Sequence, residues 1–358
     1  MELEQKFWDK LKEIKPVNLQ LKKEAYLHLD NLTKPPRSLG QLEEIAAQLY
    51  AIGQGKVQAE PARIYTCAAD HGVAEENVSP YPQEVTRQMV FNFLQQGAAI
   101  NVLCRTAGVD LKVVDVGIRG GDFPAHPNLI QARVKSGTGN IAKEPAMSKL
   151  ECLQALNLGM TLAEQAQKEG FFALGTGEMG IANTTPSTAL FCAFLNLDPK
   201  DITGMGAGLD AQGIQKKATT ISKALTTHQN SLKTGQPLAI LADLGGLEIA
   251  CLTGLILGAA RCQLPVVIDG FISSAAFLTA YKFCPQVKDY AFFAHCSAEQ
   301  AHKLILDKLK VRPLLHLDMR LGEGTGAALA LFLLKAAANI FNQMATFEQA
   351  GVSNKIES

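Results

Sequence analysis

Short apolar runs alternate with longer helical stretches along most of this chain, and this order constrains the possible folds most strongly. Each run is rich in β-branched or aromatic residues and ends abruptly at Gly, Asp, Glu or His. Strands that alternate with helices of ten or more residues indicate right-handed crossovers and a mostly parallel sheet covered on both faces. The pattern therefore predicts a doubly wound, Rossmann-like α/β fold. The predicted strands are 64–69, 111–116, 171–174, 238–241, 266–268 and 292–294.

Both ends of the chain lack this alternation. Leu42, Ile45 and Leu49 recur at helical spacing, so residues 1–60 are predicted to be a helical lead-in that packs with the C-terminal helices. Residues 327–347 are apolar almost all round, which is typical of a helix inside a fold or against a second subunit. We therefore expect a smaller helical part built from both ends. The predicted division is a lead-in at 1–60, an α/β catalytic domain at 61–330, and a C-terminal helix and tail at 331–358.

Charge and composition restrict the partners of this chain. It has 34 basic and 34 acidic side chains, so no overall field favours nucleic acid or an anionic membrane surface. The N-terminal residues are highly charged, and polar groups interrupt every long apolar run. Its eight cysteines show no C-x-x-C spacing, which favours small buried residues over a zinc site. We expect a cytoplasmic protein with a small-molecule ligand, and neither nucleic acid nor membrane as partner.

Polar residues and glycines follow the predicted strands, at the edge of a parallel sheet where ligands usually bind. Two further glycine-rich turns, 204–208 and 322–326, would let backbone amides approach an anion. Together they predict a phosphorylated ligand. Glu323 stands between two glycines before an apolar helix, where partial burial would move its pKa toward working pH, although an acidic residue there also complements the helix dipole. The predicted strand ends that carry these polar residues and glycines are 70–72, 115–117, 175–178, 243–246, 269–270 and 295–299.

Other site classes have weaker support. Residues 175–180 match G-x-G-x-x-G, so a dinucleotide-dependent oxidoreductase is an alternative, but Glu178 would repel a pyrophosphate. The acidic residue about twenty positions further on, Asp198, follows a helical segment instead of a second strand. His71, His295 and His302 form no compact ligand set with a neighbouring carboxylate. We therefore predict neither a metal nor a cofactor.

Several long blocks in order resemble one family, nicotinate-nucleotide:dimethylbenzimidazole phosphoribosyltransferase, from about Lys34 to Ala330. The resemblance implies transfer of the phosphoribosyl group from nicotinate mononucleotide to 5,6-dimethylbenzimidazole, which gives α-ribazole 5′-phosphate and nicotinate for the nucleotide loop of cobalamin. It also implies a homodimer that needs no metal. The blocks include KPPRSLGQLE (34–43), AADHGVAEENVSPYPQEVT (68–86), GTGEMGIANTT (175–185), PVVIDGFISSAA (265–276) and LDMRLGEGTGAALA (317–330).

The resemblance also implies roles for single residues. Glu323 matches the catalytic glutamate, which would act as general base on the incoming benzimidazole. Glu178 would lie beside the ribose and nicotinate, where a carboxylate could stabilise developing positive charge. Lys217 and Arg320 would assist glycine-rich turns at the phosphate. The remaining expected substrate-binding residues are Tyr81, Gln88, Gly177, Met179, Asn183, Gly206, Gly322 and Gly324.

This chain departs from the family pattern at three places. Arg37 replaces a glycine, which puts the conformation of that loop in doubt. Met205 and Ala207 replace an arginine and a hydroxyl residue in the 204–208 turn, and Ala301 replaces a glycine. Because the GEGTG sequence that contains Glu323 is intact, these departures indicate altered substrate contacts and not a different reaction. A non-catalytic sensor of nucleotides or benzimidazoles is a further alternative, and the sequence does not select among flat bases such as purines and phenols.

Overall fold

A computed structural model describes residues 2–353 of the chain and shows a parallel sheet between two helical layers. The sheet has six strands in the order β3-β2-β1-β4-β5-β6, and every neighbouring pair is parallel. The order reverses at β1, as in doubly wound folds, so the predicted fold class is confirmed. The strands are β1 (Ala62–Ala69), β2 (Asp110–Gly117), β3 (Leu129–Gln131), β4 (Ala173–Met179), β5 (Val266–Ile268) and β6 (Ala291–Phe293).

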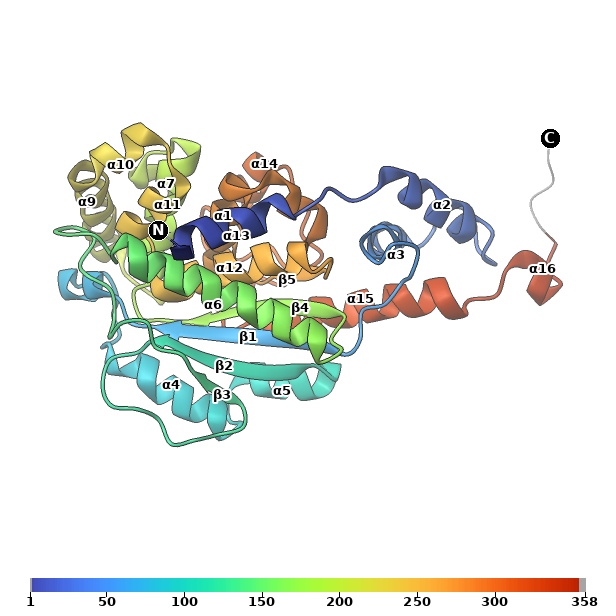
Figure 1. Ribbon diagram of the computed structural model, residues 1–358, viewed down its shortest axis with the longest axis horizontal. Coiled ribbons are helices and arrows are strands. Elements are labelled where there is room, and N and C mark those ends of the chain that lie inside the picture. The colour runs from blue at the N-terminus through green and yellow to red at the C-terminus, as the bar shows by residue number, and fades with distance from the viewer. Residues whose placement is uncertain (1, 354–358) are drawn as a thin grey trace.

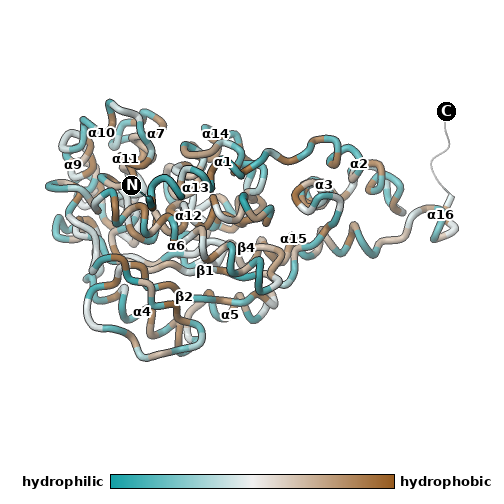
Figure 2. Tube along the Cα trace, in the orientation of Figure 1, coloured by the Kyte–Doolittle hydropathy of each residue, from teal (hydrophilic) through white to brown (hydrophobic). Residues whose placement is uncertain are grey.

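Helices cover both faces of the sheet (Figure 1). The central helix of one layer is α12 (Leu247–Arg261), which contacts β1, β2 and β4 and is buried along nearly its whole length. The other layer contains α4 (Glu84–Leu94), α5 (Ala99–Ala107) and α15 (Thr325–Gln343). Figure 2 shows hydrophobic segments running through the body between these layers. Because both faces are covered, the strands are continuous apolar runs, as β1 illustrates.

The remaining helices surround this body or extend from it. Those packed with α12 on its side of the sheet are α1 (Glu2–Lys12), α6 (Lys149–Lys168) and α13 (Phe271–Phe283). The others are α2 (Leu19–Asp30), α3 (Gln41–Ile52), α7 (Thr184–Leu195), α8 (Pro199–Ile202), α9 (Ala211–Thr227), α10 (Gln229–Thr234), α11 (Pro237–Leu244), α14 (His302–Leu309) and α16 (Phe347–Ala350), with 3-10 turns at Gly72–Glu76 and Pro285–Tyr290.

Three strand predictions differ from the structure. Residues 238–241 belong to α11 instead of a strand, because Pro237 starts a helix and a short buried apolar run has no distinctive period. Strand β4 begins at Ala173 and continues through Gly175 and Glu178, beyond the predicted end at residue 174. Strand β3 was not predicted, because this three-residue edge strand is only partly buried and has no apolar run.

An arm extends from the body and combines segments from both ends of the chain (Figure 1). In the arm α3 packs against α2 and α15, and Leu32 pairs with Thr346 in an isolated bridge. The first helix, α1, instead lies on α6, with Phe7 and Leu11 buried. The predicted helix at 327–347 is α15, which begins at Thr325 and runs through residue 330. By length and composition α15 would pass as a membrane span, yet half of that stretch is buried in the fold.

Candidate active site

A cavity of about 420 Å³ lies at the carboxyl ends of β4, β5 and β6. Ligands bind at this edge in doubly wound folds because the loops there project side chains inward. Eight of the predicted site residues line the cavity: Tyr81, Glu178, Met179, Asn183, Gly206, Arg320, Gly322 and Glu323. The other lining residues that matter below are Val78, Val85, Met89, Ile181, Thr184, Ala207, Gly270, Phe271, His295, Ser297, Glu299 and Leu321.

Four predicted site residues lie outside the lining. Gln88 is exposed on α4. A Cβ atom on Gly177 would lie 2.5 Å from the carbonyl oxygen of Glu323, so Gly177 makes room for the turn that carries Glu323. Gly324 also packs closely on β4. A Cβ atom on Gly324 would lie 3.2 Å from the Thr176 carbonyl oxygen. Lys217 is fully buried behind Gly206.

Glu323 sits in an unusual backbone turn. Its φ is 64°, and those of Gly322 and Gly324 are 82° and 98°, so the whole turn is left-handed. Glycine adopts this conformation without strain, which explains why glycines flank a residue that must point into the cavity. The Thr66 hydroxyl donates to the Glu323 carbonyl at 2.8 Å, and the Ile100 amide N–H approaches Oε2 at 3.4 Å. Burial raises the pKa of the Glu323 carboxyl, as predicted.

Glu178 is the second-last residue of β4 and lies on the same wall of the cavity as the turn that carries Glu323. Its Oε2 accepts a hydrogen bond from the Asn183 side chain. Burial, opposed by that hydrogen bond and reinforced by the charges of Asp269, Glu248 and Glu323, raises the pKa of Glu178 to about 8. Burial also raises the pKa of Asp269, directly after β5, to about 7. This concentration of buried carboxyls would stabilise a positive charge in the cavity.

One side of the cavity is an apolar slot. It is formed by Val78, Val85 and Met89 from the 78–89 segment, facing Met179 and Leu321. Tyr81 and Leu321 are more than half exposed, so they stand at the opening. Such a slot suits a flat heterocycle that needs few polar contacts. Sequence reasoning missed the aliphatic members because apolar residues that line a slot look like core residues.

Another part of the lining is polar and includes Gly206 and Ala207 of the 204–208 turn. The Gly206 amide donates to Glu299 Oε1 at 3.2 Å, and the Arg320 guanidinium lies 3.5 Å from the Gly206 carbonyl. Lys217 Nζ donates to the Thr184 hydroxyl at 2.7 Å, and burial lowers the pKa of this lysine to about 8. Thr184 and Ser297 were missed, although Thr184 belongs to one of the recognised blocks.

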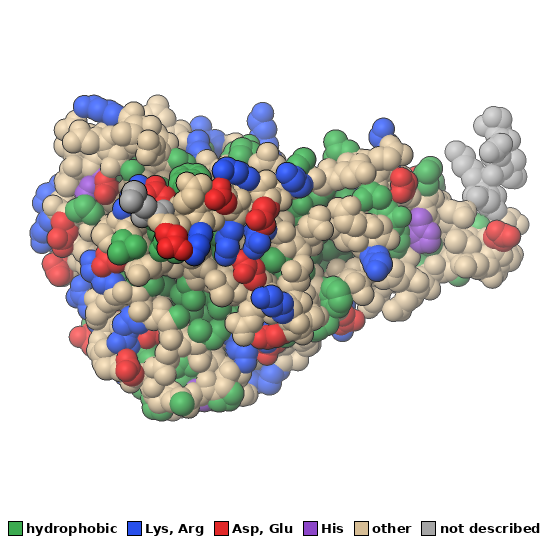
Figure 3. Space-filling model, in the orientation of Figure 1, with side chains coloured by type: hydrophobic (Ala, Val, Ile, Leu, Met, Phe, Trp, Pro, Cys, Tyr) green, Lys and Arg blue, Asp and Glu red, His purple; other side chains and the backbone are tan. Residues whose placement is uncertain are grey.

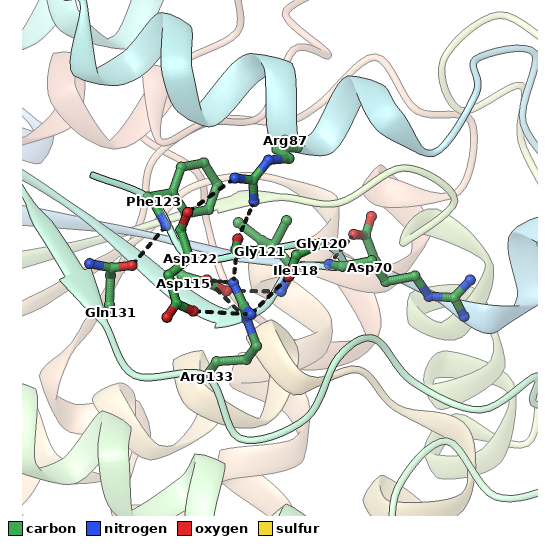
Figure 4. Close-up of polar contacts among 11 residues, drawn as sticks. Asp70, Arg87, Asp115, Ile118, Gly120, Gly121, Asp122, Phe123, Gln131 and Arg133 are labelled. Carbon is green, nitrogen blue, oxygen red and sulfur yellow. Dashed lines mark hydrogen bonds and ion pairs between the residues drawn. The ribbon is translucent and has the colours of Figure 1, made fainter. Parts of the chain in front are cut away.

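The carboxylates after β1 and β2 do not line this cavity. Figure 4 shows Asp115 accepting hydrogen bonds from the Ile118 amide at 2.8 Å and from Arg133 at 2.9 Å. Asp70 accepts from the Arg119 amide at 2.7 Å, while Arg87 donates to the Gly121 carbonyl at 2.7 Å. Asp70 and Asp115 thus lie at the expected edge of the sheet but outside the cavity lining. Their carboxylates hold the loop between β2 and β3 in place.

The residues of the alternative ligand motifs have packing roles in the structure. Gly175 and Gly177 lie inside β4, so they form no phosphate loop between a strand and a helix. A Cβ atom on Gly175 would approach Ile64 within 2.7 Å, which indicates close packing at this position. His71 bonds to Glu248 at 2.8 Å in the interior. Among residues 2–353, no group of three or more His, Cys, Asp or Glu side chains is arranged to hold a metal ion.

The departures from the family pattern leave the local structure intact. Arg37 has a φ of 63°, so it adopts the left-handed conformation that glycine favours. Gly206 keeps a φ of 54° between Met205, which is largely exposed, and Ala207, which lines the cavity. Ala301 is buried directly before α14. Contacts that require the replaced arginine or hydroxyl are absent from this turn.

Residues 14–352 fit a family model described as phosphoribosyltransferase. This class of enzyme agrees with the fold and with the cavity described above. A relative from Nitratidesulfovibrio vulgaris (strain DP4), named nicotinate-nucleotide-dimethylbenzimidazole phosphoribosyltransferase, is 58% identical over 342 residues, covering 95% of this chain and 96% of the relative. An identically named relative from Prosthecochloris aestuarii (strain DSM 271 / SK 413) is 52% identical over 353 residues, covering 98% and 99%. The chain belongs to the nicotinate-nucleotide:dimethylbenzimidazole phosphoribosyltransferase family.

Solved structures agree with this assignment. The crystal structure of CobT from Thermus thermophilus superimposes with a TM-score of 0.88 at 43% identity, covering 94% of this chain and 100% of that chain. A second structure, described as the nicotinate-nucleotide-dimethylbenzimidazole phosphoribosyltransferase of the same organism, gives a TM-score of 0.87 at 44% identity, with coverage of 94% and 99%. The similarity thus extends over nearly the whole fold.

Proposed function

We propose that this enzyme transfers the phosphoribosyl group of nicotinate mononucleotide to 5,6-dimethylbenzimidazole and releases nicotinate. The product is α-ribazole 5′-phosphate, which enters nucleotide-loop assembly of cobalamin in the cytoplasm. The family assignment supplies the reaction. One observation assigns the reaction to this cavity: the buried carboxyl of Glu323, whose pKa is raised, lines the cavity together with Glu178 and an apolar slot.

Glu323 is the general base in this proposal. One nitrogen of the benzimidazole attacks the anomeric carbon with its lone pair, while the other nitrogen loses its proton to the Glu323 carboxylate. The bond from the anomeric carbon to nicotinate breaks, and its electron pair leaves with the pyridine nitrogen. Because burial raises the pKa of Glu323, its carboxylate accepts the proton more readily than an exposed carboxylate would.

Glu178 supports the same step from the ribose side. As the bond to nicotinate lengthens, positive charge develops on the ribose ring. Glu178, oriented by Asn183, stabilises that charge in its carboxylate form, which a nearby positive charge favours over the protonated form of the free enzyme. Phosphate binding falls to the Gly206 turn with Arg320 and Lys217, at the polar end of the cavity.

The base occupies the apolar slot between Tyr81 and Met179. Contact between the base and Gln88, which lies outside the described lining, stays a prediction from the family resemblance. Gly322 borders the base and Glu178, whereas Gly177 and Gly324 act by shaping the turn that holds Glu323. Gly175 and Gly177 lie inside β4 instead of in the turn before α7, so a dinucleotide-dependent oxidoreductase is not favoured.

A homodimer is also part of the proposal. Figure 3 shows apolar side chains reaching the surface along the arm, among interspersed acidic and basic groups. Leu27 and Leu19 on α2 are 75% and 66% exposed, and Phe332 on α15 is 53% exposed. Such exposure is costly unless a partner covers it. Sedimentation should give a dimer for the native protein and a monomer for Leu27→Glu with Phe332→Glu, while Leu304→Glu on α14 should stay dimeric.

Turnover by purified protein tests the reaction. The protein is incubated with nicotinate mononucleotide and 5,6-dimethylbenzimidazole, and nicotinate and the new nucleotide are measured by mass spectrometry. Glu323→Gln should lower kcat by about 100- to 10,000-fold. Glu144→Gln, which changes an exposed glutamate outside the cavity, should not. Product from Glu323→Gln at the native rate would refute the role of Glu323, and no product from the native enzyme would refute the reaction.

A further inference from the structure

Helix α15, which begins directly after Gly324, has no capping side chain of its own. Its N-cap residue is Gly324, and no side chain of that residue can bond to the first amides. Instead Asp269, from the end of β5, accepts the Gly324 amide at 3.2 Å and the Ala327 amide at 2.9 Å. Ala327 is the third residue of the helix, the position that an N-cap side chain normally satisfies. Asp269 therefore caps α15 from a distant part of the chain.

The Asp269 side chain is held tightly in place. It is 2% exposed, and its own amide donates to the Thr176 hydroxyl at 3.0 Å. A Cβ atom on Gly326 would lie 2.9 Å from Asp269 Oδ1 and 2.3 Å from the His295 ring. A side chain at residue 326 would therefore displace either the helix start or the Asp269 carboxylate. The position of the cap is thus fixed by β5 and by the close approach of α15.

The two backbone anchors hold opposite edges of one peptide unit, the peptide bond between Glu323 and Gly324. A non-glycine residue in this conformation costs about 1 kcal/mol or more, so surrounding contacts must hold it there. The Thr66 hydroxyl holds the Glu323 carbonyl, and Asp269 holds the next amide, that of Gly324. If either anchor is lost, the turn can relax toward an ordinary conformation that points the Glu323 carboxyl elsewhere.

We propose that Asp269 is a positioning residue for the transfer reaction, which fixes the left-handed turn and so aims the Glu323 carboxylate at the base. Asp269 acts through backbone amides and does not touch the substrate. This inference rests on the proposed function, because it assigns how the proposed base is oriented. A positioning role requires a lower kcat on removal of the carboxylate, with little change in KM.

Ionisation of Asp269 gives a second readout. Burial, opposed by backbone hydrogen bonds and reinforced by the Glu323 charge, raises the pKa of Asp269 to about 7. Glu178, Glu323 and the His295 ring are the titratable groups around it. Below this pKa the protonated carboxyl is a poorer acceptor for two amides. The kcat of the native enzyme should therefore fall as pH drops below about 7, in addition to any effect of protonating Glu323.

The test is Asp269→Asn, with full kinetics in both substrates from about pH 5 to 9, on either side of the raised pKa. We expect kcat to fall at least tenfold above that pKa and KM for each substrate to stay within about threefold. The pH dependence of kcat should lose the contribution of Asp269 and keep those of Glu323 and Glu178. Asp115→Asn is the matched control, because Asp115 is equally buried and accepts a backbone amide at the end of β2, outside the cavity. This control should keep the native kcat and the native pH profile.

Thr66 provides an independent test in case Asp269→Asn does not fold. Thr66→Val removes the other anchor and should lower kcat, while Thr66→Ser keeps the hydroxyl and should restore it. The inference is overturned if Asp269→Asn turns over within twofold of the native enzyme, if it changes KM alone, or if both Thr66 variants behave like the native enzyme. Absence of product from the native enzyme would instead refute the proposed function.

Discussion

Oε1 of Glu178 lies 2.2 Å from the position that a Cβ atom would take on Gly322. The carboxylate at the end of β4 therefore abuts the turn before α15, and the two proposed catalytic carboxylates share one wall. This contact is possible only because residue 322 has no side chain. Since its φ is 82°, Gly322 meets a conformational requirement and a steric one at the same position.

Gly322→Ala should abolish most activity. The added methyl group would push Glu178 away from the ribose and strain the turn that carries Glu323, so kcat should fall at least tenfold. Gly170→Ala is the control, because Gly170 has a similar φ of 86° but open space around it. Both variants should lose about 1 kcal/mol of stability from the backbone strain alone. Equal activity of the two variants in steady-state kinetics would contradict the steric argument.

The buried carboxyl of Glu178 should make the free enzyme less stable as pH rises. Burial and neighbouring acidic groups raise its pKa to about 8, above the value of 4.5 in the unfolded chain. The folded state then holds the proton more tightly, so this contribution to stability is complete below pH 4.5 and is lost as pH rises through 8. In Glu178→Gln, the Tm should therefore decline less over that range than in the native protein.

A carboxyl with the opposite shift serves as the control for that measurement. Lys143 and Asn140 lower the pKa of Glu76 at the surface, so its titration lies below the tested range. Glu76→Gln should leave the pH dependence of Tm unchanged between about pH 5 and 8. If Glu178→Gln and Glu76→Gln give the same slope as the native protein, Glu178 is not the group that titrates there.

Lys217 should control the affinity for the nucleotide phosphate. Burial lowers its pKa to about 8, so the free enzyme loses this positive charge as pH rises above 8. The KM for nicotinate mononucleotide should rise over that range. Lys217→Gln should raise this KM about tenfold, the usual size of one charge-assisted hydrogen bond, and remove its pH dependence. Lys216→Gln, at the exposed neighbour on α9, should change neither; equal KM values for both variants would exclude Lys217 from phosphate binding.

The fold was predictable where strands are buried on both faces. Residues 64–69 and 266–268 are continuous branched and apolar runs, because helices cover the sheet on both sides. The run at 238–241 is also apolar and short, and only Pro237 before it indicates a helix instead of a strand. Strand β3 depends on pairing with β2 instead of on its own sequence, so no local pattern could have revealed it.

The site was predictable where the backbone needs glycines to adopt a left-handed conformation. Two glycines around Glu323 indicate a strained turn, and the structure places that residue in the cavity. The roles of Gly177 and Asp269 were not predictable, since a glycine that makes room for a neighbouring carbonyl looks the same in sequence as one that contacts a ligand. Likewise, Asp115 lies near the end of β2 and Asp269 directly follows β5. Only the backbone amide that each accepts distinguishes them, that of Ile118 for Asp115 and that of Ala327 for Asp269.

Arg37 provides a final prediction, on how a departure from the family pattern is tolerated. Its φ of 63° carries the strain that the usual glycine would avoid. In compensation, its guanidinium stacks 3.6 Å from the Tyr26 ring and pairs with Asp30 at 3.2 Å. Each of these partly exposed contacts contributes about 0.5–1 kcal/mol or less, which offsets the strain of about 1 kcal/mol.

Arg37→Gly should therefore change stability by less than about 1 kcal/mol, because strain and contacts disappear together. Arg37→Ala keeps the left-handed conformation but loses both contacts, so it should be the less stable of the two variants. Urea unfolding with a common m-value measures the difference. Both variants lack the contacts with Tyr26 and Asp30, so this difference reports the backbone strain alone. A more stable Ala variant would mean that residue 37 leaves the left-handed region when the arginine is removed.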